Sequence, residues 1–353
     1  MIKLIRQVTV VALLIVCFSG CSTIGYYHQS ISGHLKLISQ RERIVDIVND
    51  SARDEKLIQQ LQLSESLRSF ASERLKLPEN DSYRSYVQLE KPYVTWNVFA
   101  ASEYSIALQQ WCFLVVGCVP YRGYFDEAEA SRYAEQLAKQ GLDVYVAGVP
   151  AYSTLGWFDD PLLSSMLDRG EIVTASYIFH ELAHQQFYLK GDGNFNEAFA
   201  TAVEEIGVME WLHAHERTED IQRYKDWLLQ KSVFSKFIKD SRDEFETLYL
   251  KNFDAEKTLV EKEILIAEMR RKFIKLSGNN NHIERYAKWM SGPLNNAQLG
   301  AISLYRELVP SFHRIFALCA NDLDSFYRYV EIIGKLPEEQ RSEALLATDI
   351  CKQ

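Results

Sequence analysis

Apolar side chains recur at every third or fourth position over long parts of this chain, a spacing that lines one face of an α-helix. The pattern occupies residues 22–90, with a break at Pro78, and returns at 218–253 and 254–276. In the last two stretches charged residues lie on the opposite face, which indicates two antiparallel amphipathic helices. We therefore expect long helical arms at both ends of the chain.

The middle of the chain has a different pattern. Short stretches rich in aromatic and β-branched residues, typical of strands, occupy residues 93–99, 111–116 and 143–149. Between the second and the third, residues 126–141 begin with acids, carry a lysine late and end at a glycine, as helices commonly do. A small sheet crossed by a helix is therefore predicted.

Two helices are predicted after this sheet. The first runs from about Glu171 to Lys190 and ends at Gly191, because glycine commonly terminates helices. A short turn follows, and the second helix begins near Asn196. The predicted fold class is therefore α+β and mostly helical, with the small sheet packed by the first of these helices.

Residues 151–161, between the sheet and the first helix, contain glycine, proline and aromatic residues without periodicity. Such a composition indicates a shaped surface loop rather than a regular element. Two interpretations stay open. Residues 151–156 form an edge strand that holds an extended peptide, or Trp157 and Phe158 plug the core behind a structural turn.

Composition and charge restrict the class of protein. The chain has 353 residues, of which 47% are apolar and 12% aromatic, so it can bury a large core. Its net charge is −9, and it becomes −11 without residues 1–20, which hold Lys3 and Arg6 and no acid. This balance argues against a nucleic-acid partner, because phosphates require a basic surface.

The N-terminus has the pattern of an export signal. Lys3 and Arg6 precede an apolar run, Val8 to Phe18, that is too short to span a bilayer. The run closes with Phe18-Ser-Gly-Cys21, which resembles the lipobox of bacterial lipoproteins, where the signal is cut before an acylated cysteine. The alternative is an ordinary signal peptide with an incidental cysteine. Ser22 resembles the residue after this cysteine in lipoproteins sent to the outer membrane, so we expect a lipid-anchored envelope protein that faces the periplasm.

The remaining cysteines fit an oxidising compartment. After Cys17 in the signal and Cys21 at the anchor, four are left, which is an even number. A turn at Gly117 can bring two of them together, and the other two can hold the C-terminal tail. Buried free thiols are the alternative. The four candidates for disulfides are Cys112, Cys118, Cys319 and Cys351.

The motif that carries chemistry is His180-Glu-Leu-Ala-His184, inside the first predicted helix after the sheet. Histidines four positions apart project from the same helix face, and neutral imidazole is a good ligand for Zn²⁺. Glu181 beside the first histidine can act as general base toward a metal-bound water. An accidental pair of histidines is the alternative, and a metal site is the better interpretation.

A catalytic zinc site needs a third protein ligand and an open position for water. Glu197 is the first choice, because a short loop allows the helix that begins near Asn196 to fold back against the histidines. Glu204 and Glu205 are alternatives two turns further along. Glu204 shares the face of Glu197, so it is also a candidate to hydrogen-bond a ligand histidine or to bind a substrate amine.

Together these residues resemble the gluzincin metallopeptidases, whose third zinc ligand is a glutamate in an Asn-Glu motif on the next helix, here Asn196-Glu-Ala-Phe-Ala200. The resemblance implies that His180, His184 and Glu197 bind one Zn²⁺ ion per chain. Glu181 is then the general base. Tyr121-Arg-Gly-Tyr-Phe125 and residues 151–161, taken with both zinc motifs, resemble the bacterial putative-aminopeptidase lipoprotein family over most of the mature chain.

The sequence departs from related enzymes at two places. Thr201 stands where thermolysin-like enzymes have an aspartate that orients a ligand histidine. The zinc aminopeptidase motif whose glutamate holds the substrate amine has no upstream counterpart, and we interpret Gly207-Val-Met-Glu210 as helix core. Four acids are candidates for the amine anchor, and two tyrosines for an oxyanion stabiliser, although a buried aromatic is the commoner role. They are Glu103, Asp159, Asp160 and Glu204, and Tyr152 and Tyr305.

The sequence thus predicts a membrane-anchored zinc metallopeptidase that hydrolyses peptide bonds, with an aminopeptidase implied by the resemblance. A zinc endopeptidase that processes envelope proteins and a non-catalytic lipoprotein scaffold are the alternatives. The expected partners are a peptide or protein substrate and, through lipid on Cys21, the membrane. We expect a signal peptide at 1–20, a tether and helices at 21–90, the sheet and zinc-binding core at 91–215, and a helical region at 216–353 that forms one compact unit with the core.

Overall fold

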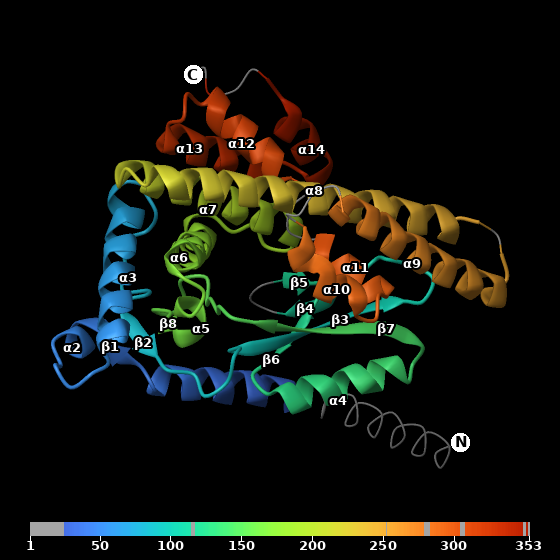
Figure 1. The fold of residues 1–353 in the computed structure, drawn as a ribbon, viewed down its shortest axis with the longest axis horizontal. Helices are drawn as coiled ribbons and strands as arrows, with labels where there is room; N and C mark the ends of the chain where they lie inside the picture. Colours follow the sequence, from blue (N-terminus) through green and yellow to red (C-terminus); the bar gives the residue numbers. More distant parts are fainter. Residues whose placement is uncertain are drawn as a thin grey trace, which may run out of the picture.

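The computed structural model describes residues 25–113, 117–251, 253–278, 283–303, 308–348 and 351. Helices predominate, and the strands form small sheets of two or three strands (Figure 1). The fold is the mostly helical α+β class that the sequence predicts. The predicted signal peptide and Cys21 lie outside the described residues. Across the described residues, every helix is too short or too polar to cross a membrane.

The N-terminal part is helical with one small sheet. Residues 25–39 form a helix, and α2 (Ile44–Val48) and α3 (Glu55–Glu73) follow it. A sheet that the sequence did not predict joins β1 (Glu42–Arg43) antiparallel to β2 (Ser85–Val87), and β2 parallel to β8 (Leu162–Leu163). Strands of two or three residues contain too few positions to produce an alternating pattern.

The central sheet has β3 (Thr95–Ser102) between β6 (Arg122–Tyr124) and β7 (Leu142–Val149), antiparallel to both. Alternate residues of β3 pack on opposite layers, as the two-residue period of a strand requires. Val98 and Ala100 pack against α4 (Glu127–Ala138), whereas Phe99 and Ala101 pack against α11 (Asn296–Ser303). The helix expected at 126–141 is α4, with the side chain of Asp126 as its N-cap.

Two helices behind this sheet form the centre of the main hydrophobic core. They are α6 (Glu171–Gln186) and α7 (Gly193–Ala214), which pack against each other, with α3 against α6 and α12 (Val309–Leu318) against α7. Figure 1 shows α8 (Thr218–Tyr249) lying across them. Buried aromatic rings such as Phe179, Phe199 and Phe312 fill the space between these helices.

The boundaries of α6 and α7 differ from the prediction. α6 ends at Gln186 rather than Lys190, since Phe187 has extended backbone and its ring packs on Phe195. The side chain of Asn196 then accepts a hydrogen bond from Leu189 N–H and donates one to the Leu189 carbonyl, which holds this segment as a loop. α7 begins three residues early because Asp192 caps it.

The C-terminal region is built from the predicted helix pair and a cap of shorter helices. α8 and α9 (Ala255–Gly278) pack on each other around a second core. Asn295 caps α11 through a hydrogen bond from Gln298 N–H to its side-chain oxygen. The remaining elements are β4 (Trp111–Phe113), β5 (Gly117–Val119), α5 (Ser164–Leu167), η1 (Glu284–Tyr286), α10 (Ala287–Ser291), α13 (Leu323–Gly334) and α14 (Glu338–Leu346).

Two disulfides join the four cysteines of the predicted set. Cys112 and Cys118 face each other across β4 and β5. Cys319, at the end of α12, pairs with Cys351 near the C-terminus. The alternative of buried free thiols is therefore wrong for these four residues.

Candidate metal centre

The first turns of α7 face the middle of α6, and this packing brings the predicted ligands together. His180 and His184 project from the same face of α6, with ring centroids 4.9 Å apart. Glu197 comes from α7. One ligand atom from each of the three residues lies within 4.8 Å of the other two.

The distances in this group are those of a cation site. Nε2 of His180 lies 3.4 Å from one oxygen of Glu197, and Nε2 of His184 lies 3.7 Å from the other oxygen. A tetrahedral zinc ion with bonds of about 2.0–2.1 Å holds its ligand atoms about 3.3 Å apart. Two imidazoles and one carboxylate are also the donor set of many catalytic zinc sites. The residues therefore fit a zinc ion.

Glu204 lies behind this group, two turns after Glu197 on α7. Its carboxylate is 3.2 Å from Nδ1 of His180, the ring nitrogen that points away from Glu197. A carboxylate at this place fixes the tautomer of the imidazole, with the proton on Nδ1 and the lone pair on Nε2. Thr201 has no carboxylate that could orient the His180 ring, whereas the carboxylate of Glu204 lies where it can do so.

The pKa values in the group follow from burial and from the acids. Burial lowers the pKa of His184 to about 4, which keeps that imidazole neutral. Burial opposes charge on His180 as well, but hydrogen bonds to Glu197 and Glu204 raise the pKa of His180 well above its ordinary value. The pKa of Glu197 is lowered, because the two histidines outweigh the effect of burial.

Glu181 differs from the other acids. Burial raises the pKa of its carboxyl to about 7, with Glu197, Asp160 and Glu204 adding repulsion and His180 opposing it. Its side chain lines the same cavity as the three ligands. A carboxyl group with a pKa near neutrality can both accept and return a proton at physiological pH.

The three candidate ligands, called the metal group below, lie in the wall of a large cavity of about 1250 Å³. Helix 25–39, the ends of β3 and β7, the loop after β7, α6, α7 and α8 all contribute to its lining. Most lining side chains are aromatic or aliphatic, which is the usual character of a substrate pocket. Arg169 and Lys231 are the cations among the described lining residues.

Of the other site residues proposed from the sequence, some line the cavity and others lie away from it. Tyr152 lines the cavity, and its hydroxyl is 3.4 Å from Nδ1 of His34. Asp160 is buried and accepts hydrogen bonds from Thr154 N–H and the Ser153 hydroxyl, so it closes the loop rather than facing a substrate. Glu103 and Asp159 do not line the cavity. Glu205 pairs with His313 rather than with the metal group. Tyr305 lies outside the described residues.

The loop 151–161 fits neither of its two predicted roles. Residues 151–156 form no strand. Trp157 is 71% exposed and Phe158 54%, so neither ring plugs the core. The side-chain bonds to Asp160 explain the conformation, because they fold the loop back on itself and turn these two rings outward.

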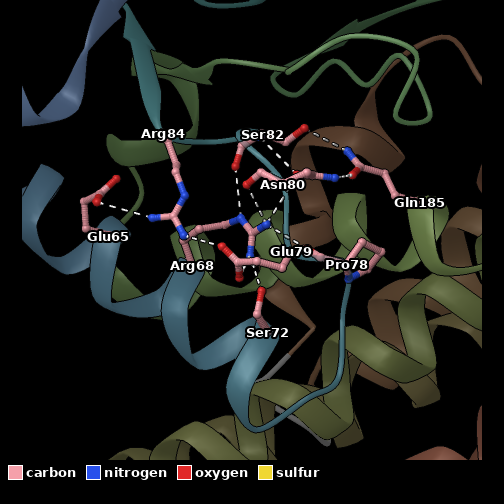
Figure 2. A network of polar contacts seen from close by, with 9 residues as sticks. All are labelled: Glu65, Arg68, Ser72, Pro78, Glu79, Asn80, Ser82, Arg84 and Gln185. Carbon is pink, nitrogen blue, oxygen red and sulfur yellow. Dashed lines mark hydrogen bonds and ion pairs between the residues drawn. The ribbon is translucent and has the colours of Figure 1, made fainter.

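A polar network supports α6 from the side of α3, and it was not predicted from the sequence. Arg68 is fully buried in α3, and its guanidinium donates to the backbone carbonyls of Ser82, Pro78 and Asn80 (Figure 2). The amide of Asn80 in turn donates to Gln185, which follows His184 on α6. The only sequence signal is an arginine at a position where the helical period of α3 calls for an apolar residue.

A family model described as putative aminopeptidase matches residues 25–345. The match includes the three candidate ligands, His180, His184 and Glu197, and the residues that line the cavity. Comparison with curated proteins gives no match, and comparison with solved structures gives none.

Proposed function

The chain belongs to the putative aminopeptidase family, and from this premise we propose that it is a zinc-dependent peptidase anchored to the membrane through Cys21. One observation carries the proposal. Two ring nitrogens and a carboxylate converge at ligand distance in the wall of a substrate-sized cavity, with a further carboxyl, Glu181, beside them.

The three ligands would be His180, His184 and Glu197. A zinc ion bound there supplies Lewis-acid polarisation of the peptide carbonyl and makes water more acidic. Glu204 orients the His180 ring through Nδ1, so that Nε2 faces Glu197 and would bind zinc in place of a proton. The neutral state of His184, which burial favours, leaves a second lone pair available.

Glu181 performs the proton transfers in this proposal. Its carboxylate takes a proton from the attacking water, and the protonated group then returns that proton to the departing amine nitrogen. A pKa of about 7 suits both steps, since neither form of the group is strongly disfavoured at neutral pH.

The first candidate activity is that of an aminopeptidase, which removes N-terminal residues, and membership of the putative aminopeptidase family supports it. The charges of the cavity favour endopeptidase activity as a second candidate. Glu181, Glu197 and Glu204 are the acids among the described lining residues, and each already has a role or a partner in the metal group. Among the described residues that line the cavity, therefore, no carboxylate is left to bind the ammonium group of a substrate.

Paired peptides distinguish the two forms. Each member of a peptide library is offered to the purified protein with a free N-terminus and with an acetylated one, and the products are identified by mass spectrometry. Stepwise loss of N-terminal residues from the free peptides alone supports the aminopeptidase. Equal internal cleavage of both sets supports the endopeptidase, and cleavage of neither set by zinc-loaded protein contradicts the proposed function.

A further inference from the structure

A stripe of apolar side chains lies exposed on the helix of residues 25–39. Tyr27, Ile31 and Leu35 are spaced by four positions, so they follow one face of the helix. Their exposed fractions are 37%, 59% and 55%. Phe158 at 54% and Trp157 at 71% continue the apolar surface on the loop after β7. We call these five residues the apolar rim.

The apolar rim borders the catalytic cavity. Tyr27, Ile31, Leu35 and Phe158 are exposed and also line the cavity, so they form its mouth. A contiguous exposed apolar surface of this kind marks an interaction site in a soluble domain. The position of the rim means that whatever covers it also controls entry to the metal group.

The helix and the loop that carry the rim are fixed to each other. The ring of His34 lies 4.9 Å from the ring of Phe158. Arg41, just after the helix, donates a hydrogen bond of 2.9 Å to the carbonyl of Asp159. The five side chains therefore present one surface rather than two independent segments.

We propose that the apolar rim docks on the lipid bilayer, so that the mouth of the cavity opens at the membrane surface. The inference rests on the proposed attachment at Cys21. Tyr27 follows Cys21 by six positions, a length of chain that reaches at most about 20 Å. The rim is therefore held near the lipid, and aromatic rings such as Trp157 and Tyr27 prefer the interface between lipid and water.

The charge of the N-terminal segment also suits a bilayer with anionic lipids. Residues 21–41, which remain after the proposed cleavage before Cys21, contain Lys36 and Arg41 and no acid, although the whole chain carries 48 acids and a net charge of −9. Lys36 is exposed next to Leu35 on the rim helix. Basic residues beside an apolar stripe are typical of helices that lie in the membrane interface.

This orientation defines the class of substrate. A cavity that opens onto the bilayer receives peptide segments presented at the membrane surface, such as the ends of anchored proteins or peptides that partition into lipid. Its many aromatic and aliphatic lining residues suit large apolar side chains. Freely diffusing polar peptides are poorer substrates for a docked enzyme.

Tryptophan quenching tests the docking. The full chain, with its own N-terminus, is reconstituted into vesicles of phosphatidylglycerol and phosphatidylethanolamine whose acyl chains are either plain or brominated. Bromine quenches a tryptophan that touches the acyl region. We expect quenching of the wild type that is lost in Trp157→Phe, because the other tryptophans are less exposed. The double variant Ile31→Asp with Leu35→Asp stays on the vesicles but loses the quenching of Trp157.

The controls separate this inference from the proposed function. Ile264→Asp with Ile274→Asp places the same two charges on α9, at positions that are 46% and 68% exposed, and leaves the quenching unchanged. Zinc content and peptide hydrolysis are measured on the same samples. Active, vesicle-bound protein with equal fluorescence in plain and brominated vesicles overturns the docking alone. If the chain does not bind vesicles, both the docking and the proposed anchor are overturned. If the wild type is a dimer in detergent and the double aspartate variant is a monomer, the rim is a self-association surface instead.

Discussion

Glu181 is a half-buried residue whose carboxyl pKa of about 7 reflects desolvation more than any single neighbour. At the scale of residues, the Glu181→Gln variant keeps the shape of the side chain and removes its ability to transfer a proton. We expect the variant to retain zinc and to hydrolyse peptides about a hundredfold more slowly, or slower still, the usual effect of losing a general base. Steady-state assays on zinc-loaded protein provide the measurement, and wild-type rates in the variant would exclude Glu181 as the base.

Glu204 is expected to act on the metal through His180. Glu204→Ala removes the acceptor for Nδ1–H of His180, and we expect zinc affinity to fall by about 10–100-fold. Competition with a chromogenic chelator measures this affinity. Glu210→Ala is the matched control, since Glu210 is an exposed glutamate on the same helix. Equal affinities in the two variants would show that Glu204 does not orient the ring.

Arg68 illustrates a residue whose role is structural. Arg68→Met leaves three backbone carbonyls without their buried donor, and we expect the free energy of unfolding to fall by about 3 kcal/mol or more. Arg84→Met removes a guanidinium of the same network that is partly exposed and bound to Glu65 and Glu79, so about 1 kcal/mol or less is expected. Urea denaturation compares the two, and similar losses would contradict this role for Arg68.

The role of a single residue could be predicted where it depends on neighbours close in the sequence, and not where it depends on tertiary contacts. His180, Glu181 and His184 follow from one local motif, because four positions make slightly more than one helical turn and Glu181 adjoins the first histidine. Glu197 required the additional assumption that the next helix folds back, and the structure places it there. Arg68 was not predictable, since its carbonyl partners come from a loop whose path only the tertiary structure defines.

At the scale of elements, the loop 151–161 is closed by a buried acid. Burial raises the pKa of Asp160 from 3.8 to about 6, partly offset by hydrogen bonds from Thr154 and Ser153. The folded state thus disfavours the carboxylate, so the protein should lose stability as the pH rises from about 4 through about 6. The loss amounts to at most about 3 kcal/mol for this group.

Asp160→Asn removes this titration. The stability of the variant relative to the wild type should therefore be higher at pH 7 than at pH 4. Urea unfolding at both pH values, with a chelator present so that metal binding does not contribute, measures the difference. A relative stability that is independent of pH would show that Asp160 does not titrate in this range.

Helices were predicted better than their ends or the small strands. The long amphipathic helices α8 and α9 follow from periodicity, because many positions repeat the same pattern. The end of α6 does not, since it depends on the packing of Phe187 on Phe195 and on the bonds between Asn196 and Leu189, which form only when α7 lies against α6. The exposure of the Trp157 and Phe158 rings could not be predicted from the sequence either, because it depends on the loop conformation that the hydrogen bonds to Asp160 hold.

At the scale of the whole molecule, the fold combines three functional parts. The pair α6 and α7 carries the candidate ligands, the central sheet and α8 enclose the cavity, and helix 25–39 closes one wall next to the segment proposed to hold the lipid. The sequence predicted the class of fold and these parts separately. Their convergence around one cavity was not predictable, because it depends on contacts between residues far apart in the chain.

The zinc content of the purified protein tests the central claim most directly. We predict about one zinc ion per chain by elemental analysis, retained in Glu181→Gln and lost in His184→Ala, because only the second removes a ligand. Binding that requires His180, His184 and Glu197 together would support the proposed site. Wild-type protein that binds no zinc, or that binds it equally after His184→Ala, would contradict the account.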